Sequence, residues 1–519
     1  MDDNMIFYEI KDDETESEKS ALRFKVLGLP TIIYAIVYGI CLYKNLTGIM
    51  TPVFTIATVV YLWFVLPRLS EDITLGKEKT KRLIPYFAGI ILLGISVFMT
   101  SDMFLIVCNY CGIMLLTMAA LIRFFCDEAG WSVVKYLLAM LEAILVPLVQ
   151  FHMFFYDGKR YREAGNHTIK INKNVKYVAI GIVCVIPVFL VVVLNLAYAD
   201  VIFDKVIDYS FFNFFGKVFD NTSITWDFIG CIILIVCVLL LVYGLMSRLS
   251  VRRVAQYELP DKKLNSVIGI TFCSVLTTVY LLFSGIQILS LFMRERMLPE
   301  GYSYSSYARE GFNQILFVAA LNLFLVFVCN TIFAKHQTLK IVLTIMCGCT
   351  YIMIASSASR LFMYIIAYHR LTYLRVLALF MLLLIAALLT GVIVSIYKPD
   401  FKLMRYFIAV TSVLYITLSF AHPDYMIAKY NISRINIHTV QSYDFDLQYL
   451  VNNMSCDAAP AMYAFAEEVY ESEASEHTQY DTYFRSYFHD VSHEYGIFDG
   501  VRSFNLSRYR AHVYAERYD

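Results

Sequence analysis

The stretch that decides the fold is LTYLRVLALFMLLLIAALLTGVIVS, residues 371–395, in which Arg375 is the one charged side chain. A helix needs about 20 consecutive apolar residues to cross the hydrocarbon core of a bilayer, so this stretch is long enough to span it. Runs of similar length recur from Val26 to Ala421. Strands of an outer-membrane barrel would instead alternate apolar and polar residues, which these runs do not. The sequence therefore predicts an all-α, polytopic transmembrane helical bundle.

Composition agrees with this prediction and indicates which classes of molecule the chain contacts. Hydrophobic residues make up 59% of the 519 residues and charged residues 17%, whereas soluble globular chains are about 45–50% apolar and about 25% charged. Lys plus Arg and Asp plus Glu both total 43, so net charge indicates neither nucleic-acid binding nor a polybasic grip on lipid headgroups. We expect the lipid bilayer as a partner and no nucleic acid.

The first 25 residues are polar and acidic, and they lack the basic region, apolar stretch and small-residue cleavage site of a signal peptide. We therefore predict a polar cytoplasmic tail over residues 1–25 and a true first span from Val26. Apolar length then predicts about eleven spans. They are Val26–Tyr43, Ile49–Leu66, Leu83–Thr100, Met103–Ile122, Tyr177–Tyr198, Ile224–Met246, Val267–Leu291, Gln314–Phe333, Ile341–Arg360, Leu371–Ser395 and Arg405–Ala421.

One further segment, Trp131–Phe155, is apolar enough to cross but is interrupted by Lys135, Glu142 and Pro147. Short loops rich in Lys and Arg stay in the cytoplasm, and the chain has three of them. All three fall on one side only if Trp131–Phe155 does not cross, so we expect an interfacial or re-entrant helix there, with a true span as the alternative. The N-terminus is then inside. The basic loops contain Lys77, Lys79, Lys81 and Arg82; Lys159, Arg160, Arg162, Lys170, Lys173 and Lys176; and Arg248, Arg252, Arg253, Lys262 and Lys263.

Beyond Ala421 the hydrophobicity falls. We predict that residues 26–421 form the bundle and that residues 422–519 form a small helical extramembrane domain on the outside. Its short helices are expected at Asp446–Asn453, Asp457–Ser472, Tyr480–Glu494 and Ser503–Tyr518.

A polar stripe runs along the end of one predicted span, where polar side chains recur every four residues from Ser356 to Thr372. A charged side chain in hydrocarbon is expensive, so Arg360 should either find a partner or snorkel to the headgroups. We expect it to pair with Glu310 or Asp200 at the outer level of the membrane, as a structural clamp rather than as a ligand site. The candidate polar cluster consists of Arg360, Glu310, Arg309, Asp200, Tyr364, Tyr368 and Arg375.

Catalytic signatures are missing from the sequence. There is no GxxxxGK[ST] loop, no GxSxG elbow and no GxGxxG after a strand. Cys108 and Cys111 have CxxC spacing but lie within a span without a second pair of ligands. His489 and His493 have i, i+4 spacing but no third ligand. We predict no catalytic residue, no metal site and no cofactor, and enzyme activity stays open but disfavoured.

Several short stretches, which cover the second half of the chain best, are similar to one family. They are Ala199–Asp200, Tyr307–Phe312, Ser359–Arg360, Leu374–Arg375, Pro423–Asp424, Ile427–Ala428, Tyr430–Asn431, Tyr449–Leu450, Asp457–Ala458 with Pro460, and Phe504–Arg508. These stretches resemble a bacterial family of polytopic membrane proteins known only as a domain of unknown function, DUF4173, and its relatives. The resemblance implies a multi-pass protein of the bacterial cytoplasmic membrane, and it implies no activity and no catalytic residues.

Two functions from different classes follow from these features, with an intramembrane enzyme as a third possibility. In the first, the chain is a binding or regulatory module of the cell envelope whose outward C-terminal domain meets envelope proteins. In the second, the bundle transports a small solute or a lipid past the polar cluster around Arg360.

Overall fold

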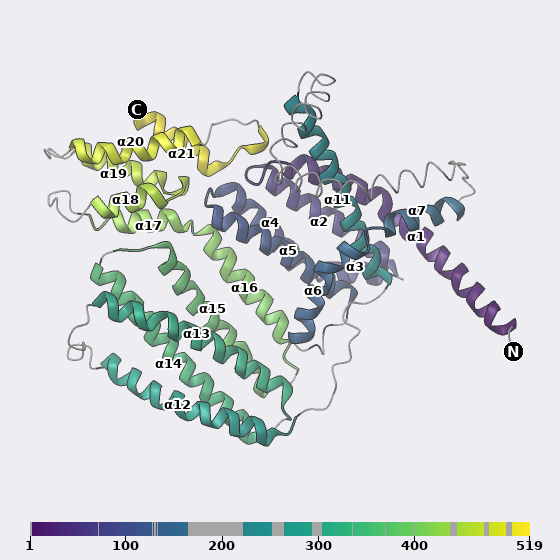
Figure 1. The fold of residues 1–519 in the computed structure, drawn as a ribbon, viewed down its shortest axis with the longest axis horizontal. Coiled ribbons are helices and arrows are strands. Elements are labelled where there is room, and N and C mark those ends of the chain that lie inside the picture. Colours follow the sequence, from purple (N-terminus) through teal and green to yellow (C-terminus); the bar gives the residue numbers. More distant parts are fainter. Residues whose placement is uncertain are drawn as a thin grey trace, which may run out of the picture. The chain divides into compact units, whose positions relative to one another are not determined.

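The computed structural model describes residues 3–70, 72–126, 128, 131, 133–164, 222–251, 264–292, 304–334, 336–368, 370–398, 400–435, 444–471, 477–494 and 501–518. Their secondary structure is helical apart from one isolated bridge between Leu264 and Phe333 (Figure 1), so the predicted all-α class is confirmed. The helices are α1 (Asp3–Leu42), α2 (Met50–Leu69), α3 (Ile73–Lys81), α4 (Ile84–Met99), α5 (Met103–Phe125), α6 (Val133–Val149), α7 (Met153–Ala164), α11 (Thr222–Val251), α12 (Ser266–Phe292), α13 (Tyr304–Ile332), α14 (Gln337–Tyr368), α15 (Tyr373–Tyr397), α16 (Leu403–Phe420), α17 (Pro423–Ile432), α18 (Asp444–Asn453), η2 (Cys456–Ala458), α19 (Ala459–Glu471), α20 (His477–Glu494), η3 (Val501–Ser503) and α21 (Leu506–Tyr518).

Nine of the described helices are long and apolar enough to cross a membrane, or up to eleven segments if each of two bent helix pairs is one span. The multi-pass prediction is therefore confirmed. Nine of the predicted spans coincide with these nine helices. Of the other two, Leu83–Thr100 corresponds to α4, which is bent by 53° from α3, and Tyr177–Tyr198 lies outside the described residues.

The segment predicted to be interfacial or re-entrant, Trp131–Phe155, contains α6 and the start of α7. These two helices are bent by 65° across a short break, so the segment is not one straight span. A broken span and a re-entrant loop both have this form, and the choice between them stays a prediction.

Contacts within the chain divide it into two compact units. The first comprises Met1–Lys44, Tyr61–Gly76 and Leu145–Arg252, and the second comprises Asn45–Val60, Lys77–Ile144 and Arg253–Asp519. The predicted domain boundaries at residues 25 and 421 are not tested by this division. The predicted N-terminal tail is, however, continuous with the first span, because α1 runs unbroken from Asp3 to Leu42.

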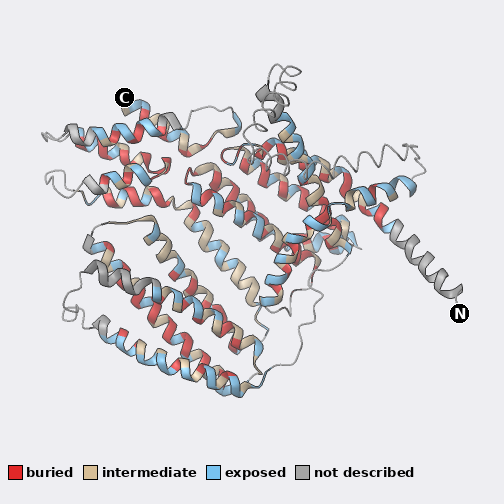
Figure 2. Cartoon of the chain, viewed as in Figure 1, coloured by how far each residue is buried: buried red, intermediate tan, exposed pale blue. Residues whose placement is uncertain are grey.

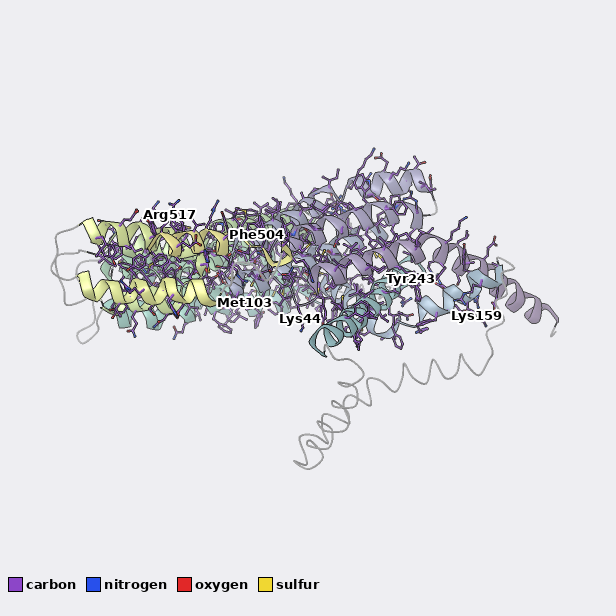
Figure 3. The ribbon with its side chains drawn as sticks, turned by 90° about the horizontal axis from the view of Figure 1, so that it is seen from above. Lys44, Met103, Lys159, Tyr243, Phe504 and Arg517 are labelled. Carbon is purple, nitrogen blue, oxygen red and sulfur yellow. The ribbon has the colours of Figure 1, made fainter. Side chains whose placement is uncertain are left out.

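The first unit is held by an ion pair that the sequence did not predict. Asp157 of α7 is fully buried and accepts from Arg23 of α1, at 2.7 Å from Nε and 2.5 Å from Nη2. From α11, Tyr243 (Figure 3) and Ser247 donate to the same carboxylate at 2.9 and 3.3 Å. The ring of Phe154 lies 5.2 Å from that of Tyr243 beside the pair. A buried carboxylate needs this complete set of donors because water cannot supply the missing ones.

In the second unit, α12 is exposed along much of its length (Figure 2). Val275, Leu282 and Leu289 are spaced seven residues apart and are 63%, 68% and 60% exposed. An apolar stripe of this kind on one face of a membrane helix is the surface that lipid chains cover.

Polar side chains join the membrane helices of the second unit from inside. The amide of Asn322 donates to Thr350 at 3.1 Å, and that of Asn330 to Ser395 at 3.2 Å. Asn109 of α5 accepts from Ser419 and Tyr415 of α16 at 2.9 and 2.8 Å. Lipid chains are as apolar as the helix surfaces, so no hydrophobic effect drives membrane helices together. Interhelical hydrogen bonds of this kind, together with close packing of small residues, hold them together instead.

The buried pair of Arg23 and Asp157 generates a stability prediction. We expect Asp157→Ala to cost about 3–5 kcal/mol, because it leaves the Arg23 guanidinium as an uncompensated buried charge. Purified protein in detergent, heated and then assayed for the fraction that stays monodisperse, measures this loss. The double variant Arg23→Met with Asp157→Leu removes both charges and should recover most of the stability. If the double variant is no more stable than Asp157→Ala, the two side chains are not coupled.

Candidate functional site

Arg360, the centre of the predicted polar cluster, lies in α14 and is 9% exposed. Its Nη2 donates to Oε1 of Gln287 in α12 at 2.7 Å, and Ser356 donates to the same oxygen at 2.6 Å. The described partner is therefore an amide rather than a carboxylate. Pairing with Glu310 or Asp200 stays a prediction, because Asp200 and the side chain of Glu310 lie outside what the structure describes.

The other members of the predicted cluster are described only in part. Arg375, in the first turn of α15, holds its guanidinium carbon 4.2 Å from the ring centroid of Tyr364, a cation–π contact. Arg375 also donates to the carbonyl oxygen of Arg370. The side chains of Arg309 and Tyr368 fall outside the described residues. The structure thus brings together Arg360 with Gln287, and Tyr364 with Arg375.

Several buried polar atoms of α12, α13 and α14 have no hydrogen-bond partner among the described residues. They include Thr277 Oγ1, Ser284 Oγ and Ser357 Oγ, together with Oδ1 of Asn322. Their side chains are between 0% and 5% exposed. Because a buried hydroxyl without a partner costs about 1–3 kcal/mol, each of these atoms requires an explanation.

The unpaired atoms come from α14 and from the two helices that pack against it, α12 and α13. Gln287 hydrogen-bonds Arg360 at a sequence separation of 73, and the buried cluster that contains Cys273 of α12 also contains residues 343, 346 and 347 of α14, at separations of 70 to 74. Because the separation is similar at these two levels, α12 and α14 run in the same direction. The same separation of 73 relates Ser284 to Ser357 and Thr277 to Thr350. The polar seam, as we call it, is formed by Thr277, Ser284 and Gln287 of α12, Asn322 of α13, and Thr350, Ser356, Ser357 and Arg360 of α14.

A second polar site lies where the C-terminal helices meet the membrane helices, and it is centred on the buried Asp457 of η2. Thr100 donates to its Oδ2 at 2.6 Å, and the backbone N–H of Ser101 to its Oδ1 at 2.9 Å. Ser507, at the start of α21, donates to Oδ1, and Nδ1 of His422 lies 3.1 Å from Oδ2. These residues and Asn505 are called the junction below.

Asn505 completes the junction by capping a helix. Its amide donates to the carbonyl oxygens of Val97 and Thr100 at 3.1 and 2.9 Å, which are among the carbonyls that the end of α4 leaves without intrahelical partners. Its Oδ1 accepts from the backbone N–H of Ser507 at 3.0 Å. The same side chain therefore ends α4 and begins α21.

Two further buried carboxylates, Asp102 and Asp424, lie beside the junction. Asp102 caps α5 through the N–H of Phe104 at 2.9 Å, and its other oxygen accepts from the Tyr373 hydroxyl at 2.5 Å. Asp424 accepts from the N–H of Ser455 at 3.0 Å, while its Oδ1 has no partner among the described residues. The group therefore carries more negative charge than its described contacts neutralise.

Burial and hydrogen bonding separate the acidities of these carboxylates. Burial raises the pKa of Asp102, and it raises that of Asp424 to about 6. Burial also acts to raise the pKa of Asp457, but hydrogen bonds from His422, Ser507 and Thr100 outweigh it and lower that pKa below its ordinary value. The donors around Asp457 thus favour its charged form, whereas burial of Asp424 favours its neutral form and holds its pKa at about 6. Among the described residues, no three His, Cys, Asp or Glu side chains are grouped to hold a metal ion.

Several junction residues stand out in the sequence, but their patterns do not predict that they form one site. Asp457 and Asn505 fall within stretches that carry the family resemblance, as does Asp424, but the resemblance assigns them no role. Asp102 directly precedes an apolar run, which is the position of a helix N-cap. Their convergence depends on contacts between residues more than 300 positions apart, which pattern and spacing do not encode.

Comparison with known families gives one match. A family model described as a domain of unknown function, DUF4153, matches residues 87–465. The expected family of unknown function is confirmed, and its number is DUF4153. No curated protein and no solved structure matches the chain. The matched residues include the polar seam, Thr100 and Asp457, and they end before Asn505.

The raised pKa of Asp424 predicts a pH-dependent stability. Its ordinary value is 3.8 and its folded value about 6, so the folded state loses stability as pH rises through this window. Asp424→Asn keeps an acceptor for Ser455 and removes the charge. We expect it to stabilise the protein by about 2–3 kcal/mol at pH 8 and by little near pH 4.

Thermal unfolding midpoints of the two proteins at both pH values measure the effect. Asp490→Asn, at a position whose side chain is 64% exposed, is the matched control and should change neither midpoint. A gain from Asp424→Asn that is equal at pH 4 and pH 8 would show that the Asp424 charge is not its cause.

Proposed function

We propose that this chain, which belongs to the DUF4153 family, is a binding or regulatory module of the bacterial cell envelope. In this proposal the chain sits in the cytoplasmic membrane with its N-terminus inside. The C-terminal helices α17–α21 lie outside, where they meet envelope proteins. The membrane helices hold these C-terminal helices in a fixed orientation.

The junction is the observation that carries the proposal. Helices α17–α21 pack around an apolar core of their own, which includes Met462, Phe465 and Phe484. They are attached to α4, α5 and α16 by buried hydrogen bonds to Asp457 and from Asn505. A helical cluster that is joined to membrane helices by satisfied buried polar groups moves with them, so a partner bound to the cluster would act on the membrane helices directly.

Charge at the helix ends supports the outward orientation. The junction contacts one end of α4, α5 and α16. Basic side chains gather at their opposite ends, and an excess of Lys and Arg marks the cytoplasmic side. These side chains are Lys79, Lys81 and Arg82 before α4, Arg123 in the last turn of α5, and Lys398, Lys402 and Arg405 around the start of α16.

Thiol labelling in intact cells tests this orientation. The natural Cys456 is unsuitable because it is 2% exposed and burial raises its pKa to about 12. Asp490→Cys and Lys81→Cys introduce thiols at side chains that are 64% and 62% exposed, in a chain without its other cysteines. We expect a membrane-impermeant maleimide to label position 490 in intact cells and position 81 only after permeabilisation. The reverse pattern would overturn the outward placement.

The polar seam favours a second function, the passage of a small solute or lipid through the membrane. Unpaired buried atoms such as Ser284 Oγ and Ser357 Oγ are satisfied if water or a polar solute enters between α12 and α14. Arg360 and Gln287 would then form the polar end of this route.

Removal of one hydroxyl tests whether water enters the polar seam. We call the seam wet if water reaches its unpaired atoms and dry if it does not. In a wet seam, Ser357→Ala loses a hydrogen bond to water and should leave the unfolding temperature unchanged or lower it. In a dry seam, the same change removes an unsatisfied group and should stabilise the protein by about 1–3 kcal/mol. Thr350→Val is the matched control, because the Thr350 hydroxyl is bonded to Asn322 and Met346 and its loss destabilises in both cases. A rise in unfolding temperature for Ser357→Ala would count against transport.

A further inference from the structure

The segment between η3 and α21 is fastened to the ends of two membrane helices. The backbone N–H of Ile49 donates to the carbonyl oxygen of Phe504 at 2.8 Å, and Asn45 donates to that of Arg502 at 2.9 Å. Ile49 directly precedes the candidate span α2. Because Asn505 also caps the end of α4, the segment lies at the level where these helices leave the membrane.

Gly48 shows how closely the two backbones approach. Its φ is +108°, and a Cβ atom there would lie 2.7 Å from the carbonyl carbon of Ser503. A side chain at this position is therefore excluded both by backbone conformation and by space. The loop before α2 and the segment 501–505 form one continuous strip of the surface.

This strip exposes apolar side chains, and their contact with water would be unfavourable. Val501 is 73% exposed, Leu46 is 56% exposed and Tyr509 is 46% exposed. Phe504 lies 6.0 Å from Phe98 in the last turns of α4 and 5.6 Å from Tyr509 in α21, as measured between ring centroids. Aromatic side chains with one polar end are enriched where the membrane meets water.

We propose that Leu46 and residues 501–510 form a lipid-binding edge, in which Val501 and the aromatic rings enter the boundary between headgroups and acyl chains. Continuity with α2 and α4 argues for lipid as the occupant, because the exposed apolar surface begins where the spans end. The exposed guanidinium groups of Arg502 and Arg510 flank the edge and suit the phosphate groups of the headgroups. This edge goes beyond the envelope-module proposal, since it would contact lipid on whichever side the C-terminal helices lie.

Fluorescence quenching by brominated lipid tests the proposal. The three natural tryptophans are replaced by Phe, Val501→Trp provides the probe, and the full chain is reconstituted into phosphatidylcholine vesicles with bromine near the top of the acyl chains. An interfacial segment lies about 5–10 Å deep, within reach of these bromine atoms, so the emission should be lower than in unbrominated vesicles. The matched control is Asp490→Trp in the same background, at a side chain that is 64% exposed beside His489. Its emission should be quenched by aqueous iodide and not by the lipid.

Equal iodide quenching at positions 501 and 490, without quenching by brominated lipid at position 501, would overturn the proposal. Leu46→Trp gives an independent reading of the same edge, and it should respond as position 501 does. Thermal unfolding of each variant checks that the fold is intact, and because Val501 and Leu46 are exposed, the substitutions remove no core contact.

Discussion

The buried carboxylate of Asp457 is the interaction on which the C-terminal helices depend. It accepts from Thr100 and Ser101 at the turn between α4 and α5, and from Ser507 at the start of α21, with His422 beside it. A buried anion that loses its hydrogen-bond donors destabilises the folded state, because water cannot reach it to replace them. The segments around it are therefore mutually dependent, because each supplies a donor that the others cannot replace.

Three buried polar groups among the described residues differ in how completely their hydrogen-bonding atoms are paired. Asp157 has its own cation, Arg23, and two hydroxyl donors. Asp457 has neutral donors together with His422. The polar seam leaves several hydroxyls unpaired among the described residues. A complete set of partners is typical of structural polar groups, whereas an incomplete one is where a proton, water or solute has room to act.

The architecture was largely predictable from the sequence because bilayer thickness sets the length of each apolar run. Leu371–Ser395 and α15 agree within two residues at each end, and no tertiary information is needed for that agreement. The limits of such reasoning appear at the partner of Arg23, a residue of the predicted polar tail. The length of an apolar run gives no sign that Asp157, 134 residues away, pairs with this arginine inside the first unit.

Partner identity was not predictable in the same way. The pairing of Arg360 with a carboxylate stays a prediction, whereas its hydrogen bond to Gln287, an uncharged residue, is not indicated by the length of the apolar runs. The junction is a stronger case. Thr100, His422 and Asp457 each look like an ordinary helix-end residue, and their common role depends on how α4, α16 and η2 pack together. Local sequence predicts a helix and the residue that caps it, but it does not predict which helix end, distant in sequence, will bind the same capping residue.

The capping of α4 by Asn505 has a consequence for biosynthesis. Val97 and Asn505 are separated by 408 residues, so the ribosome must add all of these residues before the end of an early membrane helix finds its partner. Until then, the carbonyl groups at that helix end and the hydroxyls of Thr100 and Ser101 lack the partners that the folded chain gives them. Synthesis of the segment around Asn505 is thus the step that completes the cap of α4, and a nascent chain that stops short of residue 505 presents an open helix end, which proteases that act on incompletely folded proteins can recognise.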